Sequence, residues 1–152
     1  MKVKDLMSRQ VLTIGPSDSC HEAVGRMHHA RVRHLPVINR DGMLVGVVTD
    51  RDLRHYLFSP SVFKTLGQTS VEALLKTAPV AQIMSRLVIS VPPEAELSDA
   101  AHIMMTERIG SLPVVDGGRV VGIVTETDLL RQVCQADALC SPECAEIIIS
   151  YP

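Results

Sequence analysis

A threonine and an aspartate three residues apart occur twice in this chain, each time after an apolar stretch that begins with glycine. The pairs are Thr49 with Asp52 and Thr125 with Asp128. At the start of a helix the two side chains project from the same side of the first turn, beside free backbone N–H groups. A hydroxyl and a carboxylate so placed suit the hydroxyls of a ribose, and the amides suit a phosphate. The simpler interpretation is that each threonine only caps its helix.

The pair recurs because the chain is duplicated. Val3–Leu57 aligns with Val80–Val133 after one deletion opposite Arg40, and 19 of 54 aligned pairs are identical, against roughly 3 expected for unrelated segments. The duplication predicts two similar units around a pseudo-twofold axis. Equivalent loops would then meet in a cleft with two similar binding sites.

The elements that must position these side chains follow one order in both copies. In the first copy an extended stretch at 11–14 stops at Gly15, and Ser17 or Asp18 is expected to cap a helix. Two strands, at 35–38 and 43–48, flank an Asp-Gly turn, which is typical of a hairpin. Thr49 then opens a second helix. Four methionines that recur in register indicate core or interface packing: Met7, Met27, Met84 and Met104.

Length favours two half-domains that share one core, since units of about fifty residues bury too little surface alone. We expect a first repeat at 1–58, a connector at 59–79 with a short helix at 70–76, and a second repeat at 80–137. The tail at 138–152 contains Ile147-Ile148-Ile149, which predicts an added strand or a partner contact.

Composition excludes several classes of protein. The chain is 46% hydrophobic and 21% charged, has no apolar run of membrane-spanning length and lacks the apolar start of a signal peptide. We therefore expect a cytoplasmic protein without a membrane partner. A net charge of −2, with no Trp, two Tyr and two Phe, argues against nucleic acid as a partner.

Cysteine spacing fits no familiar zinc pattern, and the cysteines do not recur between the copies. We expect no metal, although a site made by Cys134, Cys140 and Cys144 stays an alternative to reduced thiols; Cys20 stands apart. The common nucleophile, zinc-protease and phosphate-loop motifs do not occur, so we expect no enzyme.

The duplicated pattern resembles a tandem pair of CBS domains, also called a Bateman module. Met-Ser, Leu-Pro-Val, the hairpin and Gly-x-x-Thr-x-x-Asp-Leu carry the resemblance, in the same order in both copies. It implies an α/β (α+β) fold of two β-α-β-β-α repeats about a pseudo-twofold axis, with a cleft for adenosine-containing ligands. It also implies that the free pair forms a homodimer and signals to an effector protein.

The resemblance carries residue roles onto this sequence. The two Thr–Asp pairs match ribose-binding positions. The base-lining strands match Val11, Leu12, Thr13, His34, Leu35 and Pro36 in the first repeat, and Val88, Ile89, Ser90, Ser111, Leu112 and Pro113 in the second. Beside them, Arg33, His34 and Arg51 are candidate phosphate partners. Their counterparts Gly110, Ser111 and Thr127 are not, so the first site is expected to prefer more phosphorylated ligands.

The sequence therefore predicts a regulatory module that binds AMP, ADP, ATP or S-adenosylmethionine and needs no cofactor. Apolar residues spread around the later helices predict dimerisation through the helices of both repeats. They are Ala100, Ala101, Ile103, Met104 and Met105 in one helix, and Leu129, Leu130 and Val133 in the next. Two alternatives stay open. One is a structural dimerisation module with a vestigial cleft, and the other is a metal-dependent nucleotide-processing enzyme that uses Asp52 and Asp128.

Overall fold

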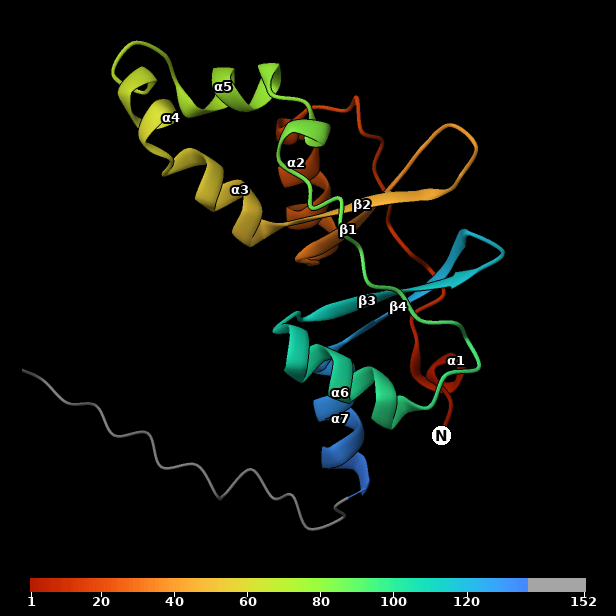
Figure 1. Cartoon of the computed structure of the whole chain (residues 1–152). Coiled ribbons are helices and arrows are strands. Elements are labelled where there is room, and N and C mark those ends of the chain that lie inside the picture. The colour runs from red at the N-terminus through yellow and green to blue at the C-terminus, as the bar shows by residue number, and fades with distance from the viewer. Residues whose placement is uncertain (137–152) are drawn as a thin grey trace, which may run out of the picture.

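The computed structural model describes residues 1–136. It consists of two halves with the same order of helices and strands, stacked on one another (Figure 1). The first half contains helix α2 (Cys20–Ala30), a hairpin of β1 (His34–Ile38) and β2 (Leu44–Thr49), and helix α3 (Asp50–Leu57). The second repeats this order with α6 (Leu97–Glu107), β3 (Ser111–Asp116), β4 (Arg119–Thr125) and α7 (Glu126–Ala136). The hairpins lie in the middle, with α2 and α3 outside one of them and α6 and α7 outside the other (Figure 1).

Short helices complete each half. They are α1 (Val3–Leu6), α4 (Pro60–Thr65), α5 (Val71–Thr77) and the 3₁₀ helix η1 (Val80–Gln82). The prediction of a helix at 70–76 is confirmed by α5, whose start is capped by the Ser70 hydroxyl, which accepts from the N–H of Ala73 at 3.1 Å. Helix α4 was missed, although Ser59 followed by Pro60 is a typical helix start.

The predicted cap of helix α2 is wrong. Its cap is Ser19, whose hydroxyl accepts from the N–H of Glu22 at 3.1 Å. Asp18 is occupied elsewhere, since its Oδ2 accepts from the N–H of Gly15 at 2.8 Å. The carboxylate therefore closes the preceding turn, and the helix begins after it.

The extended stretch before each α2-like helix adds little to the sheet. Ile14 pairs with Val37, and its equivalent Val91 pairs with Val114, each as a single parallel bridge. Each sheet is otherwise a two-stranded antiparallel hairpin. The hairpin prediction is confirmed, and Gly42 takes the positive φ of 78° that its turn requires.

Each copy of the sequence contributes its first residues to the other half. We call 3–8 and 80–85 the leading segments. The expectation of one shared core is wrong, because the buried residues form two cores, one in each half. Val3 and Met7 are buried in the second core, among residues such as Leu112, whereas Val80 and Met84 are buried in the first core. The packed halves are therefore not the sequence repeats, because the leading segments are exchanged.

Reciprocal pairing shows the pseudo-twofold relation. Ser8 bridges to Ile123, and the equivalent Ser85 bridges to Val47. Met43 and Arg119 occupy the same position in the two copies and pair with each other. A residue can pair with its own equivalent only near the axis, so the axis passes between the tips of the two hairpins.

A glycine in each second strand makes room for a methionine of the exchanged segment. A Cβ on Gly46 would lie 2.6 Å from Sδ of Met84 and 3.0 Å from the carbonyl oxygen of Ser85. Gly122 receives Met7 in the same way. This is why the Gly-x-x-Thr motif begins with glycine, and it confirms that these methionines pack in the core.

The described residues include neither a helix long and apolar enough to cross a bilayer nor a cluster of metal-ligating side chains. Cys20 is buried, and burial raises the pKa of its thiol to about 11. Cys134 is exposed at the end of α7. Cys140, Cys144 and the stretch Ile147–Ile149 lie outside the described residues, so those predictions remain as they were.

Candidate functional site

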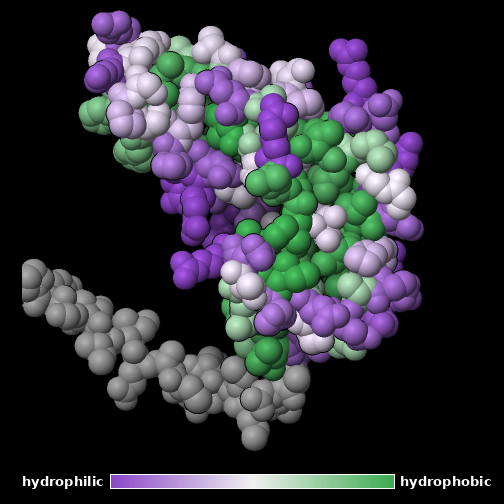
Figure 2. All heavy atoms as spheres, in the orientation of Figure 1, coloured by the Kyte–Doolittle hydropathy of each residue, from purple (hydrophilic) through white to green (hydrophobic). Residues whose placement is uncertain are grey.

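A cavity of about 620 Å³ lies between the two halves. In Figure 2 it is a hydrophilic hollow beside an apolar strip. Nine of the predicted site residues line it: Arg33, His34, Thr49, Arg51, Asp52, Val88, Ile89, Ser111 and Pro113. The exchange of leading segments explains the combination, because 80–85 pairs with β2 and the chain continues from there past Thr49. The Thr–Asp pair of one repeat therefore shares a cavity with the extended stretch of the other.

The other predicted residues do not line this cavity. Leu35 and Leu112 lie fully buried in the two cores, since alternate residues of a strand face opposite sides. The remaining ones are Val11, Leu12, Thr13, Pro36, Ser90, Thr125 and Asp128. The pseudo-twofold axis relates Val11, Leu12, Thr125 and Asp128 to residues that do line it, which marks an equivalent place on the other side of the axis.

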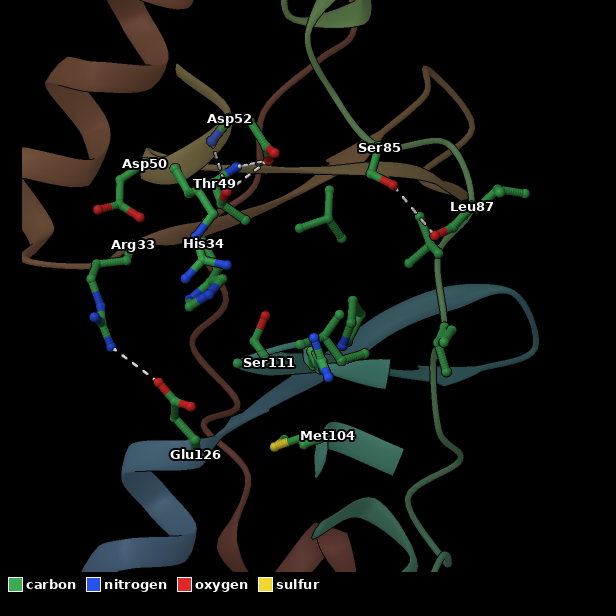
Figure 3. Close-up of a pocket in the computed structure, with 18 of the residues that line it drawn as sticks. Arg33, His34, Thr49, Asp50, Asp52, Ser85, Leu87, Met104, Ser111 and Glu126 are labelled. Carbon is green, nitrogen blue, oxygen red and sulfur yellow. Dashed lines mark hydrogen bonds and ion pairs between the residues drawn. The ribbon is translucent and has the colours of Figure 1, made fainter. Parts of the chain in front are cut away.

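Thr49 and Asp52 form a reciprocal cap at the start of α3. Oδ2 of Asp52 accepts from the N–H of Thr49 at 2.8 Å and from its hydroxyl at 2.7 Å, while Oγ1 of Thr49 accepts from the N–H of Asp52 at 3.1 Å. Thr125 and Asp128 repeat all three bonds at 2.9, 2.7 and 3.3 Å. The capping interpretation is confirmed, and Figure 3 shows the first pair at the edge of the cavity.

The two aspartates differ in their second oxygen. Oδ1 of Asp128 accepts from Nη1 of Arg131 at 3.4 Å. Oδ1 of Asp52 accepts no hydrogen bond from any residue in 1–136. One cap therefore uses a single oxygen of its carboxylate and leaves the other available to a ligand.

Both cations and anions line the cavity. Besides Arg33 and Arg51, Arg54 and Arg108 line it, and so do the acids Asp50 and Glu126. Nη2 of Arg54 lies 2.8 Å from Oδ2 of Asp50 within α3. Nη2 of Arg33 lies 3.6 Å from Oε1 of Glu126, across the two halves (Figure 3). Arginine forks of this kind suit phosphate oxygens, and the acids would oppose excess negative charge.

Sequence reasoning missed several lining residues. Ser85 lies in the exchanged segment 80–85, Leu87 comes just after it, and Met104 lies on α6. No local sequence pattern indicates that these residues line the cavity. Asp50 and Glu126 could have been found, because an acid follows the threonine in both copies.

His34 is held neutral. Burial lowers its pKa below the ordinary 6.5, and repulsion by Arg33 lowers it further, against smaller opposing effects of Asp50, Glu126 and Asp52. The imidazole is thus a neutral hydrogen-bond partner at neutral pH, and an anionic ligand beside it would raise its pKa and favour the cation.

The lowered pKa makes stability depend on pH. The unfolded chain binds a proton at this histidine below pH 6.5 that the folded chain does not bind, so the free energy of unfolding falls as the pH drops through that range. His34→Ser copies the residue at the equivalent position, Ser111. We expect its free energy of unfolding, measured in urea on both sides of pH 6.5, to fall less on acidification. An unchanged pH dependence would contradict this assignment.

The sequence of this chain was compared with those of known proteins and protein families. Residues 3–59 and 80–134 each match the sequence profile of the CBS domain. A CBS domain-containing protein of Dictyostelium discoideum is 34% identical over 129 residues, which cover 84% of this chain and 88% of that protein. The chain spans a smaller share of other relatives, such as 32% of an uncharacterized protein of Methanocaldococcus jannaschii.

Two solved structures resemble the molecule and contain adenosine compounds. CBSX2 in complex with AMP has a TM-score of 0.72 and 30% identity, with coverage of 89% of this chain and 97% of that one. The CBS domain pair of protein MJ0100, in complex with 5′-methylthioadenosine and S-adenosyl-L-methionine, also has a TM-score of 0.72 and 30% identity, with coverage of 90% and 98%. Both are CBS structures of the length of this chain.

Proposed function

The chain belongs to the CBS domain family, and from this premise we propose that it is a regulatory module that binds an adenosine-containing ligand between its two halves. The observation that carries the proposal is the carboxylate of Asp52. It keeps one oxygen available beside the Thr49 hydroxyl, at the edge of a cavity of ligand size. The complexes of the two related structures support the same ligand class.

In this proposal the ribose lies against Thr49 and Asp52, and the base lies against the aliphatic side chains of Val88 and Ile89. The phosphate, or the equivalent end of another ligand, lies toward Arg33 and Arg51, with His34 close by. AMP, ADP, ATP and S-adenosylmethionine are all candidates. The ligand acts by changing how an effector protein associates with the module. A cytoplasmic location, and the lack of nucleic-acid and membrane partners, rest on composition alone.

A thermal-shift screen of adenosine, AMP, ADP, ATP and S-adenosylmethionine tests the ligand class. A ligand at 100 times its Kd stabilises the folded chain by about 2.7 kcal/mol, which raises Tm by roughly 5–10 °C. Guanosine and cytidine monophosphates serve as controls for the base. No shift with any adenosine compound would favour a purely structural module, and release of phosphate from ATP would favour an enzyme.

We also propose a homodimer formed through the outer faces of the helices. Ala100 and Met104, predicted for the same surface, are instead buried in the second core. Leu130 and Val133 are 64% and 63% exposed on α7, and Met105, 77% exposed on α6, also lines the cavity. Such apolar exposure on a small protein marks an association surface, and a twofold dimer is the closed arrangement for identical chains.

Light scattering is expected to give twice the chain mass of 16.6 kDa at micromolar concentration. Leu130→Glu should shift the mass to that of a single chain, because it places a charge in the proposed interface. Phe63→Glu is the matched control, since Phe63 is equally exposed at 64% but lies on α4. A single-chain mass for the unaltered protein would refute the dimer.

A further inference from the structure

Three pairs of equivalent residues line the same cavity. The alignment pairs Arg33 with Gly110, His34 with Ser111 and Asp50 with Glu126, and all six line the cavity described above. Two equivalent residues can face one cavity only if both lie close to the pseudo-twofold axis. We call these six residues the shared wall.

Rotation about the pseudo-twofold axis exchanges the two members of each pair, so it maps the shared wall onto itself. It is therefore also a wall of the equivalent site, the one that contains Thr125 and Asp128. The same backbone bond holds each side of it, because the N–H of Asp50 donates to the carbonyl of Arg33 at 3.1 Å and the N–H of Glu126 donates to the carbonyl of Gly110 at 3.0 Å. The shared wall therefore lies between the cavity and the equivalent place at Thr125 and Asp128.

The shared wall is not symmetric in charge. Arg33 is equivalent to Gly110 in the alignment of the two copies. This pair of positions therefore supplies one guanidinium, although each of the two sites would use one. The Arg33 side chain crosses between the halves to Glu126, with both side chains more than half exposed (59% and 56%). An exposed ion pair at 3.6 Å contributes little, so a phosphate group can take Arg33 from Glu126.

We propose that Arg33 serves both adenosine sites but only one at a time, so that a phosphorylated ligand in one site weakens binding in the other. This inference rests on the proposed function. A charge-assisted hydrogen bond to phosphate changes affinity by roughly tenfold or more. The second AMP should therefore bind roughly tenfold more weakly than it binds when the first site is empty. Adenosine, which has no phosphate, should fill the sites independently.

Calorimetric titration of the full chain with AMP measures this coupling. Asp128→Ala and Asp52→Ala each disable one ribose anchor, so each variant reports the affinity of the other site alone. The product of these two dissociation constants is compared with the product of the two stepwise constants of the unaltered chain. We expect the second product to be larger by roughly tenfold, whatever the intrinsic difference between the sites. Asp52→Asn and Asp128→Asn replace any alanine variant that fails to fold.

Two further variants identify the cause. Gly110→Arg gives the wall its second guanidinium. The nearest atoms to a Cβ there would be Oε1 and Cδ of Glu126 at 3.3 and 3.4 Å and Nε2 of His34 at 3.5 Å, all in side chains, and the exposed Glu126 side chain can move aside by a few tenths of an ångström. The two products should then become equal. Arg33→Gly should weaken both sites for AMP and also remove the coupling.

Mere repulsion between two bound phosphates predicts the opposite for Arg33→Gly, a stronger antagonism, and that result would overturn the sharing of Arg33. Equal products in the unaltered chain, with both sites binding AMP, would also overturn it and would leave the proposed function intact. If the unaltered chain binds neither AMP nor adenosine, both proposals fail.

Discussion

Asp52→Ala is expected to weaken the binding of an adenosine-containing ligand by at least roughly tenfold, because hydrogen bonds to a charged partner are worth about 1.5–3 kcal/mol. The loss should be similar for adenosine and AMP, since both carry the ribose. Calorimetry or thermal shift with the ligand found in the screen measures it. Unchanged affinity in a folded variant would reject Asp52 as the ribose anchor.

The same substitution also removes the carboxylate side of the capping box at Thr49, and the lost hydrogen bonds cost about 1 kcal/mol of stability. Asp128→Ala is the matched control for this effect, because Asp128 makes the same three capping bonds at the start of α7. If the cap alone matters, both variants lose stability equally and both keep the affinity of the cavity at Asp52. If Asp52 binds the ribose, only Asp52→Ala lowers the affinity of that cavity for the ligand.

Gly46→Ala is expected to reduce the free energy of unfolding by about 1–3 kcal/mol, the usual effect of overpacking a core. Its added Cβ would lie 2.6 Å from Sδ and 3.1 Å from Cγ of Met84, and 3.0 Å from a backbone oxygen that cannot swing away. Denaturation in urea measures the loss. Met84→Ala in the same background should cost less than it does alone, because it removes the clash.

Gly25→Ala is the control with the opposite sign. Gly25 lies in the interior of α2, and a Cβ there would meet nothing within 4 Å. Alanine is the better helix residue by about 0.8–1 kcal/mol, so this variant should be more stable than the unaltered chain. A stabilising Gly46→Ala would contradict the exchange of leading segments at this contact.

The sequence predicted the local elements well, because each depends on a short pattern. The Asp-Gly turn, the cap at Thr49 and the recurring methionines were all visible in single stretches. The exchange of leading segments was not, since an alignment of two copies says which segments are alike and not which half each one joins. From the sequence alone, Val3 could pack equally well against the first core or the second.

The site shows the same division. The Thr–Asp pairs are local and could be found, whereas the meeting of Thr49 with Val88 depends on the exchange and could not. One difference between the pairs was nonetheless readable: Arg131 follows Asp128 by three residues, where His55 follows Asp52, and the arginine occupies the second oxygen of Asp128. Proximity along a helix turn made that contact predictable.

The exchanged segments also set an order of events during synthesis. The residues of the first core lie between Ile14 and Met84, so this core can close once 80–85 is made and before the rest of the second repeat. Val3 and Met7 are made before the first core, but their partners include Val124, whose synthesis follows roughly 5–25 s later at ordinary elongation rates. The leading segment 3–8 is therefore made before the first core and packs after it. A chaperone or a ribosome-bound factor would find Val3 and Met7 exposed throughout that interval.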